Sequence, residues 1–301
     1  MSSFTSSSNM KKYFFRILLF TFGVILINTT IFFIVKEYYY KPYENIPEIT
    51  SNDTVFIMAD SHGGPLKQNL REHGIYNFSI GSDSYFDIYR KIIFLKKHHN
   101  VKKVLITADD HTLSFYREKL NNKDRSVYFL GLDDKDFLLG DKISIIKEKY
   151  FKRYIPLFNA KTTGIVERYF KSLFKDKKPK IYDWATNENK QKDSEKRAKK
   201  QFLGTESSES LKLCMTEIVK FCRENNIDII AVKFPLAKDY LTEVNGRNFG
   251  ADTHFTELGI KTYDFTEIYI DHDEYFANQD HLNDIGGEMF AKELLKIVEA
   301  D

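Results

Sequence analysis

The chain has 301 residues, of which 42% are hydrophobic and 29% are charged. A chain of this size and composition can bury an ample core, as one large domain or two small ones. Its 45 lysines and arginines nearly balance its 43 aspartates and glutamates, which leaves a formal net charge of +2. Nucleic-acid-binding proteins normally carry a basic face or stripe, so this balance argues against a nucleic-acid partner.

The first element predicted along the chain is a membrane-spanning helix at residues 17–35. This stretch (ILLFTFGVILINTTIFFIV) contains no charged residue and lies between Arg16 and Lys36. Its 19 residues would extend over about 28 Å as a helix, close to the roughly 30 Å hydrocarbon core of a bilayer. No cleavage site with small residues follows it, so we expect an uncleaved single-pass anchor rather than a signal peptide.

The flanking residues predict the orientation of this anchor. Lys11, Lys12 and Arg16 precede the span, and short basic tails tend to stay in the cytoplasm. We therefore expect a cytoplasmic tail at residues 1–16 and an anchor in the cytoplasmic membrane. A stiff, non-helical tether containing two prolines should follow at residues 36–53. The soluble part should then lie on the outer side of the membrane.

The rest of the chain, residues 54–301, alternates predicted strands with predicted helices. Short apolar and β-branched runs bounded by turn residues indicate buried strands, at residues 54–58, 75–80, 101–107, 227–232 and 260–263. Apolar residues at helical spacing indicate helices at residues 85–97, 211–223 and 287–298. This alternation predicts an α/β fold of three layers, with a flavodoxin-like parallel sheet between two layers of helices.

The middle of the chain does not follow this pattern. Residues 112–205 are rich in Lys, Asp, Phe and Tyr and show helical periodicity at best, so we expect a helical insertion or lid there. Within it, residues 187–200 (NENKQKDSEKRAKK) mix charges of both signs, which is typical of a solvated helix or loop. Cys214 and Cys222 lie eight residues apart in one predicted helix. That separation is about 12 Å along the axis, too far for a disulfide.

Four segments place chemically active residues after predicted strands or just before the last helix. Reactive groups in an α/β sheet gather beyond the carboxyl ends of its strands. A serine exposed on a sharp turn, near backbone N–H groups and within reach of a histidine, is the arrangement that nucleophilic catalysis needs. The segments are Asp60-Ser61-His62-Gly63-Gly64, the residues around Gly81, Ala108-Asp109-Asp110-His111, and residues 278–287 (NQDHLNDIGG).

Together these segments resemble the sequence blocks of the SGNH/GDSL family of serine esterases and acyltransferases. FIMADSHGG resembles the first block, with Ala59 in place of its usual glycine, and Gly81 in NFSIGSDSY is placed like the glycine of the second. ITADDHT occupies the place of the third block, and NQDHLNDIGG resembles the fifth, with its histidine and trailing glycine. The resemblance covers about residues 54–110 and 226–298. It is nearest to membrane-anchored bacterial members associated with the modification of cell-surface polysaccharides.

The resemblance implies a role for each matching residue. Ser61 would be the nucleophile and His281 its general base, with the backbone N–H groups of Ser61 and Gly81 forming the oxyanion hole. Asp60 would brace the turn. Asn278 stands three residues before the histidine, where the family tends to have an aspartate, and its carbonyl could fix the tautomer of the imidazole.

Two departures from the family pattern bear on activity. The third block usually supplies an asparagine to the oxyanion hole, but Asp109 and Asp110 stand in that region. A carboxylate would repel an oxyanion, so we expect this donor to be missing or to come from elsewhere. Asp264 or Asp280 could replace the acidic member, although Asp280 is adjacent to His281 and is expected to reach its ring poorly.

The same residues raise the question of a metal. His62, Asp109, Asp110 and His111 include possible ligands, but their spacing matches no compact metal motif. We therefore predict no metal and no cofactor, and we expect His62 and His111 to line the pocket.

The sequence leaves three functions open. The leading prediction is an esterase or O-acyltransferase that acts through an acyl-enzyme on acylated sugars or surface polysaccharide outside the cytoplasmic membrane. The alternative is an inactive SGNH-like protein that binds or assembles surface polysaccharide. The third is an anchored protein whose α/β domain only resembles this family. The sequence predicts the membrane and an acylated sugar or polysaccharide as partners, and it does not identify protein partners.

Overall fold

The structure is a computed structural model that describes residues 7–174, 183–204 and 206–300. It divides into two compact units. The first unit combines Met1–Asn45 with Ile143–Lys178, and the second combines Ile46–Lys142 with Pro179–Asp301. The expected insertion at residues 112–205 is therefore divided between them: its central part packs with the N-terminal helix, and its two ends belong to the unit with the sheet.

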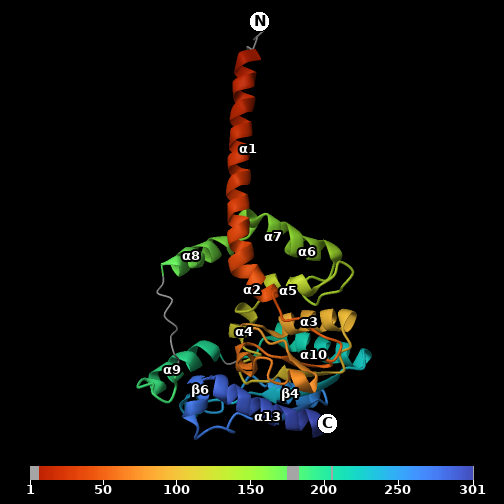
Figure 1. Cartoon of the computed structure of the whole chain (residues 1–301), viewed down its shortest axis with the longest axis vertical. Coiled ribbons are helices and arrows are strands. Elements are labelled where there is room, and N and C mark those ends of the chain that lie inside the picture. The colour runs from red at the N-terminus through yellow and green to blue at the C-terminus, as the bar shows by residue number, and fades with distance from the viewer. Residues whose placement is uncertain (1–6, 175–182, 205, 301) are drawn as a thin grey trace. The chain divides into compact units, whose positions relative to one another are not determined.

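The N-terminal helix of the first unit is long (Figure 1), and between Ile17 and Phe33 most of its exposed side chains are apolar. It comprises α1 (Ser7–Val35), one π-helical turn η1 (Lys36–Tyr40) and α2 (Lys41–Glu44). By length and composition, Met10–Glu44 could cross a membrane. The prediction of a non-helical tether from residue 36 is wrong up to Glu44, because Pro42 falls in the first turn of α2, where proline is tolerated.

The central segment of the chain packs against the C-terminal end of α1. Its elements are α6 (Lys142–Ile146), η5 (Lys147–Phe151), α7 (Lys152–Tyr154), η6 (Pro156–Phe158) and α8 (Thr162–Leu173). Ile165 of α8 is buried against Val35 and Tyr40. Asn28 Nδ2 donates a 3.2 Å hydrogen bond to the carbonyl of Tyr154, whose ring also stacks on that of Phe32.

The second unit contains the parallel sheet that the sequence predicts. Its strands are β1 (Val55–Met58), β2 (Ile75–Asn77), β3 (Lys103–Thr107), β4 (Asp228–Lys233) and β5 (Lys261–Asp264). They pair in parallel in the order β2-β1-β3-β4-β5, which is the flavodoxin-like order. The α/β prediction is confirmed, and each predicted strand matches an observed strand within a few residues.

Helices cover both faces of this sheet. Figure 1 shows α13 (Asp284–Ala300) on one side of β4, and α3 (Tyr85–His98) and α10 (Glu209–Glu224) on the other. The remaining elements of this unit are the following: α4 (Phe115–Lys119), α5 (Lys123–Ser126), α9 (Lys190–Gln201), α11 (Lys238–Val244), α12 (Ala251–Glu257), the 3₁₀ turns η2 (Ser61–Leu66), η3 (Arg71–His73), η4 (Val127–Phe129) and η7 (Asp273–Tyr275), and the hairpin strands β6 (Phe276–Asn278) and β7 (His281–Leu282). Cys214 and Cys222 are buried in α10 as free thiols.

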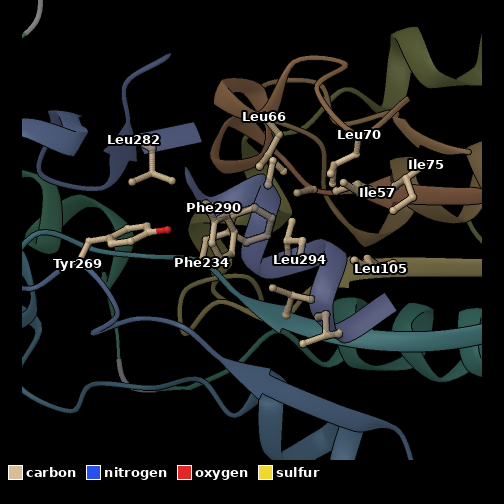
Figure 2. Packing of buried hydrophobic residues seen from close by; sticks show 14 of the residues in the cluster. Ile57, Leu66, Leu70, Ile75, Leu105, Phe234, Tyr269, Leu282, Phe290 and Leu294 are labelled. Atoms are coloured by element: carbon tan, nitrogen blue, oxygen red, sulfur yellow. The ribbon is translucent and has the colours of Figure 1, made fainter. Parts of the chain in front are cut away.

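The core beneath α13 fixes the position of the turn that follows β1. Figure 2 shows Phe290 and Leu294 of α13 packed between the strand residues Ile57 and Leu105 and the side chain of Leu66 in η2. Burial of such side chains contributes about 1.5–3 kcal/mol each. A Cβ on Gly287 would lie 2.2 Å from the carbonyl oxygen of Pro65, so glycine is needed where α13 approaches η2. The glycine pair in the last sequence block thus serves packing beside the site.

Candidate active site

Ser61 is the first residue of η2, directly after the carboxyl end of β1. Asp60 Oδ1 accepts a 3.0 Å hydrogen bond from the backbone N–H of His62 and so braces the turn, as predicted. Gly63 is also required here, because a Cβ on it would lie 2.2 Å from Ser79 Oγ. The turn leaves Ser61 partly exposed while its neighbours Asp60 and His62 are buried.

His281 reaches Ser61 from the hairpin of β6 and β7. Its Nε2 lies 2.8 Å from Ser61 Oγ, although the two residues are 220 positions apart in the chain. Its side chain is 18% exposed, so the pair is open to a substrate. The structure thus brings together the two residues that the sequence singled out as nucleophile and base.

Two oxygen acceptors hold the other ring nitrogen of His281. Nδ1 lies 3.0 Å from Asn278 Oδ1 and 2.9 Å from Asp280 Oδ1. Because both atoms can only accept, Nδ1 carries the proton and Nε2 is left as an acceptor for the Ser61 hydroxyl. The expectation that Asp280 reaches the ring poorly is wrong. The backbone N–H of Asp280 donates to Asn278 Oδ1 at 3.1 Å, and this Asx turn folds the Asp280 side chain back toward the ring.

Asp280 supplies the negative charge that Asn278 cannot. Its side chain is 1% exposed. Burial would raise its pKa, but the charge and hydrogen bond of His281, the hydrogen bond of His62 and the charge of Arg197 hold the pKa well below its usual range. Asp264, the other candidate, lies on β5, where it pairs with Lys233 at 3.2 Å and with Thr266.

Two residues of α9 fix Asp280 in place, and the sequence analysis missed both. Arg197 Nε donates to Asp280 Oδ2 at 2.6 Å, and Gln201 Nε2 donates to the same oxygen at 3.1 Å. The prediction that residues 187–200 form a merely solvated helix or loop is therefore wrong for Arg197. One signal was available, because the small or uncharged residues Ser194, Ala198 and Gln201 recur at helical spacing in this charged run, and all three are buried.

His62 lies behind the Ser61–His281 pair and bridges two carboxylates. Its Nδ1 is 2.6 Å from Asp109 Oδ2, its Nε2 is 3.6 Å from Asp280 Oδ2, and its ring centroid is 4.9 Å from that of His281. Burial favours the neutral ring, but the charges of Asp60 and Asp109, the hydrogen bond to Asp109 and the nearby carboxylate of Asp280 raise the pKa of His62 well above its usual value. His62 is 3% exposed. It therefore supports the site from the protein interior. The prediction that His62 lines the pocket is wrong, because its side chain is buried.

The two aspartates of the third segment are turned away from the position of an oxyanion. Asp109 Oδ1 accepts from the backbone N–H of Phe234 at 2.7 Å, and Oδ2 accepts from Thr107 Oγ1 at 3.0 Å and from His62. Asp110 pairs with Lys233 at 2.7 Å, and burial raises its pKa to about 6. Neither carboxylate is thus a free charge that would repel an oxyanion.

His111 is also buried rather than pocket-lining. It is 4% exposed, and its Nε2 lies 3.6 Å from Asp60 Oδ2. Burial lowers its pKa below the usual value, even though Asp60 acts in the opposite direction. Arg117 of α4 lies 3.4 Å from the same Asp60 oxygen. The three carboxylates of Asp60, Asp109 and Asp280 therefore face the cations of Arg117, Arg197 and protonated His62.

Gly81 lies beside Ser61, where the resemblance places an oxyanion-hole glycine. A Cβ on Gly81 would be 3.8 Å from Ser61 Cβ. Within the described part of the chain, the backbone N–H groups of Ser61 and Gly81 donate to no protein acceptor, so both remain available to a ligand. Asn122, which the sequence analysis missed, donates from Nδ2 to the Gly81 carbonyl at 3.0 Å. This bond positions the loop that contains Gly81. Asn122 lies outside the four segments that resemble the family's sequence blocks.

The histidines and aspartates of the site form two clusters that could hold a cation. Ligand atoms of His62, Asp280 and His281, and separately of Asp60, His62 and Asp109, lie within 4.8 Å of one another. Most of these atoms already bind protein donors or acceptors. The absence of a metal and a cofactor stays a prediction.

A cleft of about 490 Å³ is lined in part by Asn278, whose side chain contacts His281. Asn278, Gln279 and Trp184 line it together with Lys196, Arg197 and Lys200, and the carboxylates of Asp183 and Asp193 also face it. Two residues of this lining also belong to the site: Asn278 contacts His281, and Arg197 contacts Asp280.

The raised pKa of His62 predicts a pH-dependent contribution to stability. Because the folded state binds this proton more tightly than the unfolded chain, the contribution is complete below the unfolded value of about 6.5 and is lost as pH rises through the folded pKa. We expect His62→Gln to destabilise the protein more at about pH 6 than at alkaline pH. Thermal unfolding of detergent-solubilised wild type and variant at both pH values measures this. A loss of stability that did not change with pH would show that His62 is neutral.

Three solved structures are similar to this chain. A proposed acylhydrolase from Bacteroides fragilis aligns over 88% of this chain and 95% of its own, with 10% identity and a TM-score of 0.39. A GDSL-like lipase from Bacteroides thetaiotaomicron aligns over 89% and 97%, with 11% identity and a TM-score of 0.38. A proposed lipolytic protein of the G-D-S-L family from Desulfitobacterium hafniense aligns over 81% and 99%, with 10% identity and a TM-score of 0.38. No protein-family model and no curated protein matches the chain.

Proposed function

We propose that the protein is a membrane-anchored serine esterase or O-acyltransferase of the SGNH type, which acts on acylated sugars outside the cytoplasmic membrane. The observation that carries this proposal is the 2.8 Å contact between Ser61 Oγ and His281 Nε2, with Nδ1 of the same ring on the buried Asp280. A nucleophile on its base, with the base on a carboxylate, is the geometry of an activated serine.

The reaction proceeds in two halves. Ser61 Oγ attacks the ester carbonyl carbon while its proton passes to His281 Nε2, and Asp280 stabilises the resulting imidazolium. The N–H groups of Ser61 and Gly81 bind the oxyanion. When the tetrahedral intermediate collapses, the bond to the alcohol breaks, the alcohol takes the proton from His281, and the acyl group stays on Ser61. Water or a sugar hydroxyl then repeats these steps in reverse, giving hydrolysis or transfer.

The site supports catalysis over the inactive alternative. That alternative was motivated by an absent acidic residue and by carboxylates at the oxyanion, but Asp280 supplies the acid and Asp109 faces His62 instead. The asparagine that the family's third block supplies to the oxyanion hole has no counterpart in the matching segment of this chain. The oxyanion would therefore be bound by two backbone N–H groups alone, those of Ser61 and Gly81. Losing one such donor typically costs about 3 kcal/mol of transition-state stabilisation.

The cleft beside Asn278 supports a sugar as the alcohol or acceptor. Its lining of amides, lysines and an arginine around the single tryptophan offers several hydrogen-bond partners to hydroxyl groups. The anchor and the predicted outward orientation support a substrate at the cell surface, such as a polysaccharide.

The test uses the full-length protein in detergent with p-nitrophenyl acetate, with and without an oligosaccharide acceptor. We expect release of p-nitrophenol that Ser61→Ala abolishes, and mass spectrometry of the oligosaccharide distinguishes transfer from hydrolysis. A wild type no faster than Ser61→Ala, with and without the acceptor, would reject the enzymatic proposal.

A further inference from the structure

The segment of residues 143–174 exposes a much larger share of large apolar side chains than the second unit, which is several times longer. Ten such side chains are exposed in it, against nine in all the described residues of the second unit. Phe174, Ile143 and Phe158 are the most exposed, at 86%, 77% and 69%. Large apolar side chains exposed together in one short segment mark a contact with a membrane or another protein.

The same segment is strongly basic. It contains seven lysines and arginines but only two acidic residues, Glu148 and Glu167. Both glutamates pair with lysines of their own helical turns, Lys152 and Lys171, and Arg153 pairs with Glu44 of the N-terminal helix. With seven basic and two acidic residues, the segment still has a formal net charge of +5. Exposed aromatic residues combined with excess basic charge are typical of helices that lie in the interface of an anionic membrane.

The position of the segment along α1 decides between a membrane and a protein partner. It contacts α1 through Asn28 and Phe32, near the C-terminal end of the apolar stretch, and the Tyr169 ring packs edge-on against that of Tyr38. Figure 1 shows α6 and α7 leaving the foot of α1 on one side and α8 on the other. A segment held at this level of a spanning helix lies where lipid headgroups meet the hydrocarbon.

We propose that residues 143–174 form a membrane collar, a set of interfacial helices that embed their apolar side chains at the outer surface of the bilayer around the foot of α1. This proposal rests on the proposed membrane anchoring, but not on esterase activity. The apolar side chains enter the acyl boundary, and the lysines and arginines bind anionic headgroups. The collar adds interfacial contacts to those of the single span.

The test labels single cysteines with an environment-sensitive fluorophore in full-length protein reconstituted in nanodiscs of phosphatidylcholine and phosphatidylglycerol. Phe158→Cys and Leu173→Cys report on the collar, and Ile25→Cys reports on the span. Leu213→Cys is the matched control, because Leu213 is also apolar and exposed, at 57%, but lies in the second unit. The native cysteines are buried, and labelled wild type gives the background.

Lipids that carry a quencher near the headgroup or deep in the acyl chain then report the depth of each label. We expect shallow quenching at positions 158 and 173, deep quenching at position 25 and none at position 213. Labels at 158 and 173 that behaved like the label at 213, while position 25 was quenched, would overturn the collar and favour a protein partner for this surface. An unquenched position 25 would overturn the anchoring, and the collar with it. None of these outcomes depends on catalysis, so esterase activity is tested separately.

Discussion

Ser61→Ala and His281→Ala should each reduce ester hydrolysis by roughly a million-fold, and the double variant should be no slower than either one. The reason is the 2.8 Å contact between the two side chains. The base has no function without its nucleophile, and the hydroxyl is a weak nucleophile without its base. Rates of p-nitrophenyl acetate hydrolysis by the three variants and the wild type measure this effect.

Ser51→Ala is the matched control for these variants. Ser51 is exposed in a turn before β1 and lies outside the site, so this variant should keep the wild-type rate. If the effects of Ser61→Ala and His281→Ala multiplied in the double variant, the two residues would be acting independently, and the proposed nucleophile–base pair would be wrong.

Asp280→Asn should reduce the rate by about ten-thousand-fold, the loss typical of removing the carboxylate behind a catalytic histidine. Asn278→Ala should reduce it by only about thirtyfold, because it removes two neutral hydrogen bonds, to His281 and to the backbone N–H of Asp280, of about 1 kcal/mol each. Since Asp280 has a lowered pKa, it is ionised throughout the neutral range. Its replacement should therefore reduce the rate at every pH where the wild type is active.

Circular dichroism must accompany the comparison of these two variants, because Asp280→Asn also leaves Arg197 and His62 with less compensating charge. A folded Asp280→Asn protein with nearly full activity, beside an impaired Asn278→Ala protein, would make Asn278 the residue that supports His281.

The Ser61–His281 pair could be predicted because each residue lies in a short block with a local pattern. A strand followed by Asp-Ser-His-Gly-Gly, and a histidine followed by a glycine pair and a helix, can be recognised within ten residues. The sheet was predictable for the same reason, since each buried strand is a short apolar run bounded by turn residues.

The spacing of Ser194, Ala198 and Gln201 indicates only that their helix has a buried face. The partners of Arg197 and Asn122 could not be predicted, because they lie in segments far apart in the chain. Arg197 reaches Asp280 across 83 positions, and Asn122 reaches Gly81 across 41. The error on Asp280 has a local cause, since the Asx turn at Asn278 redirects a side chain that simple alternation along a strand would point away from its neighbour. The packing of residues 143–174 against α1 also depends on tertiary contacts, which the hydrophobic periodicity of the sequence does not indicate.

The most direct test of the central claim is whether Ser61 is an activated nucleophile in the folded, full-length protein. The full chain is the right material, because residues 143–174 pack on α1 and belong to its unit. The detergent-solubilised protein would be treated with a fluorophosphonate probe and analysed by intact mass and peptide mapping. The account predicts one adduct per chain, on the peptide that contains Ser61, and no adduct in Ser61→Ala. A folded protein that stayed unlabelled, or was labelled at another residue, would contradict it.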